Sequence, residues 1–302
     1  MTSTPTKNIK DCFIPHNGNE GLFITCDFSQ LEVCALAELT GDPVLIKELK
    51  DGVDIHRANA AVWKKCRPEE VTDKERKQAK VMTFQLQYGA GATKIAETLG
   101  ITVRDAKEFI DAFYDKYEKI NDWHTELTQA KKYYPSPREK DSYEVLSLEL
   151  SKSPVHRQYT IKAKDTGSGD YYYPLTEMKN YPVQGFATGD LVPLVVNRIL
   201  YILDEKNKKC RSIKAENRGA SELVSTVHDD FCIDLLFADD MYYVLSVIEV
   251  VFEDLPNYFK ELFDYDLKVQ YNYDVKIGTD FADMQKITRK EIKDILGEIK
   301  NG

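Results

Sequence analysis

The pattern of apolar and polar positions predicts strands near both ends of the chain and helices between them. Short apolar or alternating runs predict strands over 9–15, 22–28, 155–162, 223–236 (a hairpin) and 267–277. Helical periodicity predicts helices over 30–40, 43–50, 54–65, 72–89, 93–99, 103–134, 183–203, 241–263 and 289–302. Strands separated by a long helical stretch must build their sheet from non-contiguous segments. The predicted fold class is therefore α+β with a helical insertion.

The helix over 72–89 carries a graded stripe of side chains. It begins with a capping box and ends at a glycine, so both of its ends are marked. Arg76, Lys80, Phe84 and Tyr88 recur every four residues and wind along one stripe roughly 18 Å long. Two cations followed by two rings suit a nucleoside triphosphate. The alternative is a surface helix with solvated cations and with aromatic rings packed in the core.

Two acidic positions are candidate metal ligands. Asp27 stands where an apolar strand turns into a helix, and Asp229 and Asp230 stand at the predicted hairpin turn. Phosphoryl transfer needs divalent ions, carboxylates that hold them, and cations that neutralise developing charge. A helix N-cap for Asp27 and a solvated turn for the other two acids remain open as alternatives.

Composition describes a globular protein of one large domain or two. The 302 residues are 42% hydrophobic and 30% charged, with no apolar run of about 18 residues and no signal-peptide pattern. We therefore expect a cytoplasmic protein, from a bacterial or phage-infected cell, without a membrane contact. The six cysteines show no metal spacing and are expected to be reduced. The net charge of −9 disfavours a nucleic-acid partner, but basic clusters over 64–80, 152–164 and 206–218 leave room for a basic face.

Three motifs in order resemble the polymerase domain of family A DNA polymerases, especially phage-type members. They are DFSQLE at 27–32, R-x3-K-x3-F-x3-YG at 76–89 and VHDD at 227–230. Weaker matches are DIH at 54–56, RQY at 157–159 and NYPVQGFATGD at 180–190. The resemblance implies an antiparallel palm sheet with a helical fingers insertion: palm over 1–58, fingers over 59–175 and palm again over 176–302.

The resemblance also implies roles for individual residues. Two Mg²⁺ ions, for which Mn²⁺ can substitute, would be held by Asp27, Asp229, Asp230 and the carbonyl of Phe28. Catalytic roles fall to Asp27, Asp229 and Lys80. The incoming dNTP would be bound by Gln30, Glu32, His56, Arg76, Lys80, Phe84 and Tyr88, with Glu32 excluding a ribose 2′-hydroxyl. Primer-template DNA would contact Arg157, Gln184 and His228.

The implied activity is template-directed addition of dNTPs to a primer 3′ end. Thumb and exonuclease domains have no counterpart in the sequence, so a separate polypeptide is an expected partner. Departures from the family pattern are Asp230 in place of glutamate, Cys34 in place of arginine, and an extra residue after Gln184. Two alternatives are a non-catalytic subunit that binds DNA or a partner, and a relative of the single-subunit RNA polymerases.

Overall fold

Contacts within the chain divide it into two compact units. The computed structural model describes residues 9–129, 145–149, 154–165, 167, 171–212 and 221–301. The sheet unit comprises Met1–Leu31, Thr188–Asp266 and Tyr271–Gly302, and the helical unit comprises Glu32–Ala187 and Leu267–Gln270. We predicted boundaries after 58 and 175. The contacts group the residues with changes of unit after 31, 187, 266 and 270, and the division into palm and fingers stays a prediction.

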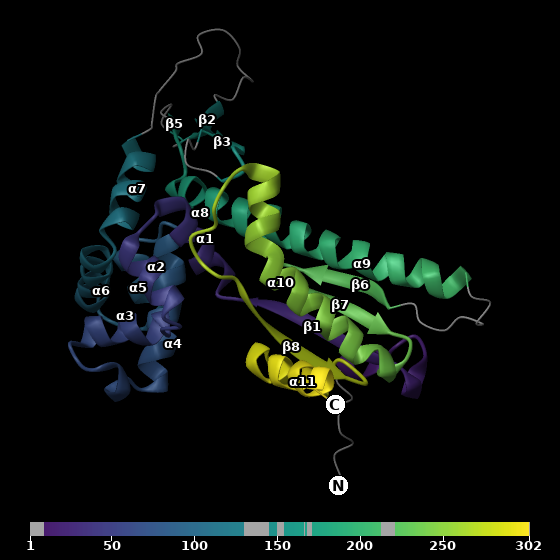
Figure 1. Ribbon diagram of the computed structural model, residues 1–302. Coiled ribbons are helices and arrows are strands. Elements are labelled where there is room, and N and C mark those ends of the chain that lie inside the picture. Colours follow the sequence, from purple (N-terminus) through teal and green to yellow (C-terminus); the bar gives the residue numbers. More distant parts are fainter. Residues whose placement is uncertain are drawn as a thin grey trace. The chain divides into compact units, whose positions relative to one another are not determined.

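The sheet unit is built on one five-stranded antiparallel sheet, as the alternating segments predicted. Its strand order is β6 (Glu222–Val227), β7 (Asp230–Leu235), β1 (Leu22–Ser29), β8 (Asn272–Gly278) and β9 (Gln285–Thr288). Every neighbouring pair runs antiparallel, although β1 and β7 are about two hundred residues apart in the chain (Figure 1). The non-contiguous sheet expected from the sequence is therefore confirmed.

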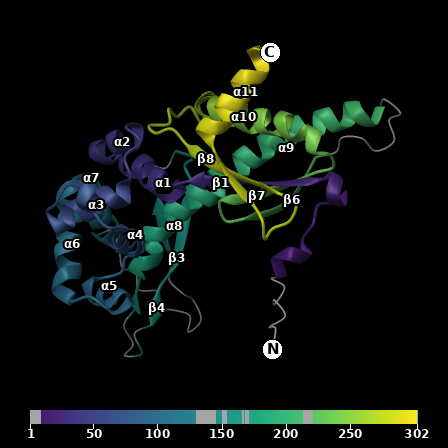
Figure 2. The ribbon, with the colours of Figure 1, turned by 90° about the horizontal axis from the view of Figure 1, so that it is seen from below.

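Helices cover one face of this sheet. The helices α9 (Val192–Ser212), α10 (Met241–Phe263) and α11 (Arg289–Asn301) lie on the same side of the strands (Figure 2). The Phe28 ring lies 4.9 Å from that of Phe252 on α10, which in turn lies 4.5 Å from the Tyr273 ring on β8. Because side chains alternate across a strand, the residues beside Phe28, among them Asp27, point to the opposite face.

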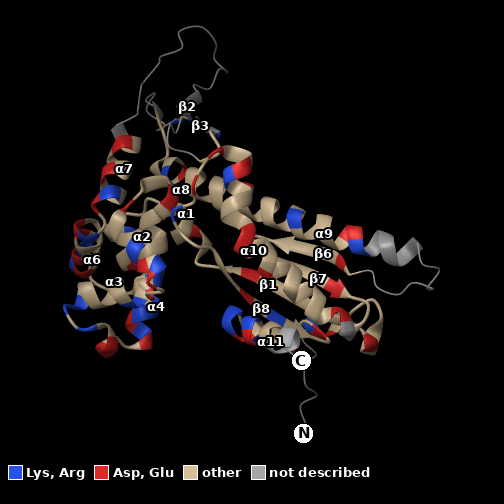
Figure 3. Ribbon diagram, viewed as in Figure 1, with Lys and Arg blue, Asp and Glu red and all other residues tan. Residues whose placement is uncertain are grey.

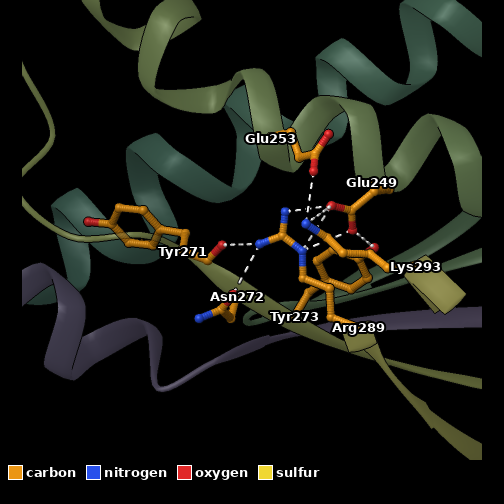
Figure 4. A network of polar contacts seen from close by, with 7 residues as sticks. All are labelled: Glu249, Glu253, Tyr271, Asn272, Tyr273, Arg289 and Lys293. Atoms are coloured by element: carbon orange, nitrogen blue, oxygen red, sulfur yellow. Dashed lines mark hydrogen bonds and ion pairs between the residues drawn. The ribbon is translucent and has the colours of Figure 1, made fainter. Parts of the chain in front are cut away.

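A buried ionic network fixes α11 against α10 and β8 (Figure 4). The Arg289 guanidinium donates to both carboxylate oxygens of Glu249, at 2.8 and 2.9 Å for its shortest bonds, and the Tyr273 hydroxyl donates to Glu249 at 2.6 Å. Burial alone would raise the pKa of Glu249, but the hydrogen bonds from Arg289 and Tyr273 outweigh it and lower the pKa to about 2. Lys293 adds a second cation, at 3.1 Å. The network therefore keeps Glu249 ionised.

The helical unit consists mainly of short capped helices. They are α1 (Leu31–Thr40), α2 (Pro43–Lys50), α3 (Ile55–Lys64), α4 (Asp73–Gln87), α5 (Ala92–Leu99), α6 (Val103–Lys116), α7 (Glu118–Gln129) and α8 (Leu175–Phe186). Two small antiparallel pairs join them: β2 (Val145–Glu149) with β3 (Gln158–Lys162), and β4 (Lys164–Asp165) with β5 (Tyr171–Tyr172). Side chains of Asp42, Asp54, Thr72 and Thr102 accept the first free N–H groups of α2, α3, α4 and α6.

The structure corrects several element predictions. The segment 9–15 is not a strand: Ile9–Cys12 forms a 3-10 turn, and both edges of β1 are taken by β7 and β8. The single helix predicted over 103–134 is interrupted at Tyr117, which is fully buried and donates to Glu48 at 2.6 Å and to Asn59 at 2.9 Å. Its predicted end beyond 129 lies outside the described residues, as do residues 213–218 of the basic segment over 206–218. Strand β9 was not predicted.

One helical stretch has the length and apolar composition of a membrane span. Among the described residues it is Leu175–Lys206. Within its α9 part, Val195, Ile199 and Leu203 recur at helical spacing and are all buried in the core of the sheet unit. The apolar composition of α9 is accounted for by this packing.

Candidate active site

Three aspartates stand side by side across the middle of the sheet. Asp27 on β1 is paired directly with Asp230 on β7 and with Asp274 on β8. Directly opposed residues of antiparallel strands project from the same face, which here is the face opposite Phe28 and α10. We call Asp230, Asp27 and Asp274 the carboxylate row. It brings two of the predicted metal ligands together from segments far apart in the sequence.

The third predicted acidic ligand lies at the turn beside this row. His228 and Asp229 form the two-residue turn between β6 and β7, where exposed His228 has a positive φ of 58°. The backbone carbonyl of Asp229 accepts a hydrogen bond of 3.3 Å from the N–H of Phe28. Burial raises the pKa of Asp27, and the negative charge of Asp229 raises it further. The Asp229 carboxylate is therefore close enough to act electrostatically on Asp27. The sequence motifs that supply them therefore meet.

The carboxylate row is electrostatically crowded. Burial, and after it the charge of Asp27, raises the pKa of Asp230 to about 6. The cation of Lys276 acts in the opposite direction, lowering the pKa of both Asp27 and Asp230 without cancelling these effects. Crowded oxygen donors of this kind favour a divalent cation, and Mg²⁺ is usually held by one or two carboxylates together with water or phosphate oxygens. Asp27, Asp229 and Asp230 supply carboxylate oxygens of the chemical type that such an ion prefers.

The described part of the chain contains no metal site that is complete from side chains alone. No group of three or more His, Cys, Asp or Glu side chains among those residues has the arrangement of a complete binding site. An open site that needs ligands from a substrate agrees with this observation, because Mg²⁺ keeps several positions for water and phosphate.

Asp274 was not predicted as a site residue. Alternation in the segment from Tyr273 to Gly278 places Asp274 and Lys276 on one face, but only the register of β8 against β1 places Asp274 opposite Asp27. Its carboxylate forms an ion pair of 2.8 Å with Lys286 on β9. Acidic residues thus lie on β1, β7 and β8, with lysines beside them (Figure 3).

The graded stripe lies on α4 of the helical unit, and α4 has the predicted ends. Thr72 and Glu75 form the capping box, and Gly89 follows the helix with a φ of +78°. The buried side of α4 is a different stripe, made of Ala79, Met82, Thr83 and Leu86. Lys80 is exposed, and Arg76, Phe84 and Tyr88 are only partly buried. The rings of Phe84 and Tyr88 are thus not fully buried, as the alternative expected, whereas the exposed Lys80 agrees with that alternative.

The cationic half of the stripe meets residues of the motif at 54–56. Arg76 Nε donates to the Asp54 carboxylate at 2.5 Å, and both side chains are 36% exposed, so a ligand can reach the pair. Burial would raise the pKa of Asp54, but hydrogen bonds from Arg76 and the Arg57 N–H lower it. His56 is buried 5.6 Å from the Phe84 ring. Burial and then Lys80 lower the pKa of His56 to about 4, which keeps its imidazole neutral at pH 7.

Three further predicted residues form one hydrogen-bonded triad in the helical unit. The Tyr88 hydroxyl donates to Glu32 Oε2 at 2.6 Å. The Gln184 amide on α8 donates to Glu32 Oε1 and lies 3.2 Å from the Tyr88 hydroxyl. Glu32, Tyr88 and Gln184 thus come together from α1, the end of α4 and α8. Nothing in their sequence spacing indicated that they would interact.

Tight packing holds the α8 member of this triad in place. A Cβ atom added at Gly185, next to Gln184, would lie only 2.5 Å from the Tyr159 hydroxyl oxygen on β3. Tyr159 is itself buried. The two remaining predicted residues are exposed at loops: Gln30 between β1 and α1, with a positive φ of 55°, and Arg157 just before β3.

Comparison with known proteins gives concordant matches. The sequence profile described as DNA polymerase family A matches residues 1–283. DNA polymerase I of Borreliella burgdorferi is 38% identical over 117 residues, covering 39% of this chain and 13% of that protein. DNA polymerase I of Lactococcus lactis subsp. lactis is 28% identical over 232 residues, covering 76% of this chain and 23% of that protein. The chain thus spans less than a quarter of either relative.

A solved structure shares the fold. It is described as the POL domain of Pol1 from M. smegmatis in complex with DNA primer-template and dNTP. The similarity has a TM-score of 0.62 at 21% sequence identity and covers 90% of this chain and 42% of that one. At this identity the likeness supports the fold alone.

Proposed function

Because the chain belongs to DNA polymerase family A, as the match over residues 1–283 shows, we propose that it is a template-directed DNA polymerase core. It would add deoxynucleotides to the 3′ end of a primer. The observation that carries this proposal is the meeting of Asp27 with Asp230, its partner on β7, and with Asp229 at the adjoining turn. Carboxylates whose pKa is raised by burial and by neighbouring negative charge, as for Asp27 and Asp230, cost folding free energy, and a bound cation would give them a function.

In this proposal the sheet unit supplies the carboxylates. Asp27 and Asp229 would hold two Mg²⁺ ions, assisted by the carbonyl of Phe28 and by Asp230. Such ions would supply positive charge against the negative charge that develops during phosphoryl transfer. The register of β1 against β7 fixes the side chains of Asp27 and Asp230 before any ligand arrives, so little ordering is needed on binding.

The helical unit would supply the groups that bind the nucleotide. Lys80 and Arg76 neutralise its phosphates, and Arg76 exchanges its ion pair with Asp54 for a phosphate oxygen. His56, neutral at pH 7, is suited to donating a single hydrogen bond without adding charge. Phe84 packs beside the sugar and base.

The triad of Glu32, Tyr88 and Gln184 would select the sugar. Glu32 occupies the space that a ribose 2′-hydroxyl would need, and two hydrogen-bond donors hold its carboxylate in one position. A fixed side chain excludes a hydroxyl more strongly than a mobile one because it cannot rotate away without losing both bonds. Gln184 would exchange its 3.2 Å hydrogen bond to the Tyr88 hydroxyl for a minor-groove acceptor of a base pair.

Primer-template DNA and dNTPs are the proposed partners, with Arg157 on the nucleic-acid backbone and His228 near the primer end. A further polypeptide segment that grips the duplex is also part of the proposal. The relatives extend well beyond the matched region, which supports it. A single-subunit RNA polymerase is the second candidate. Glu32 speaks against it, because such an enzyme must admit the 2′-hydroxyl.

Primer extension by the purified chain tests the proposal. The unaltered protein should extend a primed template with dNTPs in the presence of Mg²⁺ and should stop when EDTA removes the metal. Asp27→Asn and Asp229→Asn should each abolish extension, whereas the exposed Asp294→Asn on α11 should retain it. Far-UV circular dichroism should show that all three variants fold. The assay is run with and without lysate of the source cells, since a missing partner would restore activity.

Three outcomes would contradict the proposal. Full primer extension by a folded Asp27→Asn variant would show that the Asp27 carboxylate does not hold a metal ion needed for the reaction. Preference for rNTPs over dNTPs on the same template would favour the RNA polymerase alternative. DNA binding without extension under every condition, lysate included, would favour a non-catalytic subunit.

A further inference from the structure

A pair of lysines lies beside the carboxylate row on the same face of the sheet. Lys276 on β8 is paired directly with Lys286 on β9. Each lies two residues along its strand from the row, because Asp274 is paired with Thr288. Side chains two residues apart share a face, so the lysine pair and the carboxylate row project in the same direction.

The pairing of these lysines is not explained by stability. Like charges directly opposite each other on neighbouring strands are unfavourable. Lys286 forms an ion pair of 2.8 Å with Asp274, yet its side chain is 56% exposed, so this bond contributes little. Lys276 is partly buried, and its positive charge lowers the pKa of Asp27 and of Asp230. Two cations are thus held at one place on an otherwise acidic surface.

The face around the lysine pair is bounded on the side away from the carboxylates. Thr25 on β1 is paired with Lys276, and Cys232 on β7 is paired with Thr25. Both Thr25 and Cys232 are buried. Two residues farther along β1, the Phe23 ring lies 4.8 Å from the Phe281 ring, which also contacts Phe13 at 5.8 Å. The lysine pair therefore lies on the β8–β9 side of this face, between a covered apolar end and the carboxylate row.

We propose that Lys276 and Lys286 bind phosphates of the primer strand just upstream of its 3′ end. This inference rests on the proposed function, which puts the primer terminus at the carboxylate row. Two residues along a strand span about 6.8 Å. That distance corresponds to about two nucleotide steps of about 3.4 Å each along a duplex axis. A strand that ends at the carboxylates would thus bring one of its last phosphates over the lysine pair.

Two other roles are outcomes of the test. The lysines would contact the triphosphate of the incoming nucleotide if they lay on the other side of the reacting bond. They would act only as counter-ions if their sole partners were Asp27, Asp230 and Asp274. Primer contact predicts an effect on DNA affinity and its salt dependence. Triphosphate contact predicts an effect on the KM for dNTP, and a counter-ion role predicts an effect on Mg²⁺ dependence.

The experiment measures binding of a primed duplex across a salt series. The variants are Lys276→Gln and Lys286→Gln, and the matched control is Lys290→Gln, an exposed lysine on α11 of the same unit. Each site variant should reduce the slope of log affinity against log salt by about one. Between 50 and 200 mM salt, one lost contact corresponds to roughly a 3.5-fold smaller fall in affinity. The control should retain the full slope, and Lys286→Arg should retain most of it.

A double variant separates phosphate contact from charge compensation. Asp274→Asn removes the ion-pair partner of Lys286. If Lys286 contacts phosphate, Lys286→Gln still lowers the salt slope in the Asp274→Asn background. If Lys286 only compensates Asp274, the double variant binds DNA with the slope of the unaltered protein, and the proposal is overturned. A raised KM for dNTP with an unchanged salt slope would also overturn it.

Primer extension by the unaltered protein is measured on the same preparations. If the unaltered protein extends the primer and both lysine variants keep the full salt slope of DNA affinity, the proposed phosphate contact is contradicted and the polymerase proposal stands. If the lysine variants have reduced salt slopes but the unaltered protein extends no primer, the polymerase proposal is contradicted and a DNA-binding face remains. The two failures are therefore distinguishable.

Discussion

Asp230→Asn should stabilise the protein at alkaline pH. The pKa of Asp230 is about 6 in the folded chain, against an ordinary value of 3.8. One pKa unit corresponds to about 1.4 kcal/mol, so ionised Asp230 would cost the folded state about 3 kcal/mol at most. Asp230 is only partly buried, and solvent screening reduces the expected gain to about 1–2 kcal/mol.

The pH dependence of this gain follows from the direction of the shift. The folded state holds the Asp230 proton more tightly than the unfolded state, so this group costs stability as pH rises from about 4 to above 6. The advantage of Asp230→Asn should therefore be full at pH 8 and close to zero at pH 4. Added Mg²⁺ should narrow the difference at pH 8, because a bound cation relieves the same repulsion in the unaltered protein.

Urea unfolding followed by far-UV circular dichroism in EDTA measures these differences. The exposed Asp294→Asn on α11 is the control for loss of one negative charge, and it should change stability little at either pH. An Asp230→Asn variant that is no more stable than the unaltered protein at pH 8 would contradict this prediction. A gain in stability of the same size at pH 4 would also contradict it.

Three further variants test other parts of the structure. Glu32→Ala should raise ribonucleotide use, measured as the ratio of kcat/KM for rNTP and dNTP; an unchanged ratio would refute the role of the triad. Phe84→Tyr should weaken discrimination against dideoxynucleotides in competitive extension, since its hydroxyl can replace the missing 3′-hydroxyl; unaltered discrimination would show that Phe84 is misplaced. Arg289→Met should cost about 3 kcal/mol in urea unfolding because it leaves the Glu249 carboxylate buried with fewer donors; a loss below about 1 kcal/mol would contradict this.

Local interactions explain what could be predicted from the sequence. The ends of α4 and its stripe of Arg76, Lys80, Phe84 and Tyr88 were predicted because caps and four-residue spacing act within a few turns of one helix. The alternating segments predicted strands β1, β6, β7 and β8 for the same reason. The segment 9–15 shows the limit: it has a strand-like pattern, but β7 and β8 already pair with both edges of β1, the next strand in the chain.

The neighbours of each predicted residue were decided only by the tertiary structure. Strand register is set between segments far apart in the chain, and a slip of one residue would turn each side chain to the other face. The sequence determined that Asp27, Asp229 and Asp230 were candidate ligands. Folding determined that Asp230 and the unpredicted Asp274 flank Asp27.

The same distinction holds in the helical unit. The sequence singled out Arg76 as a cation for phosphate, but folding pairs it with Asp54, 22 residues away. It singled out Gln184 for DNA, but folding also bonds it to Glu32, 152 residues away. Contacts over such separations depend on how whole helices pack, and helix periodicity carries no information about them.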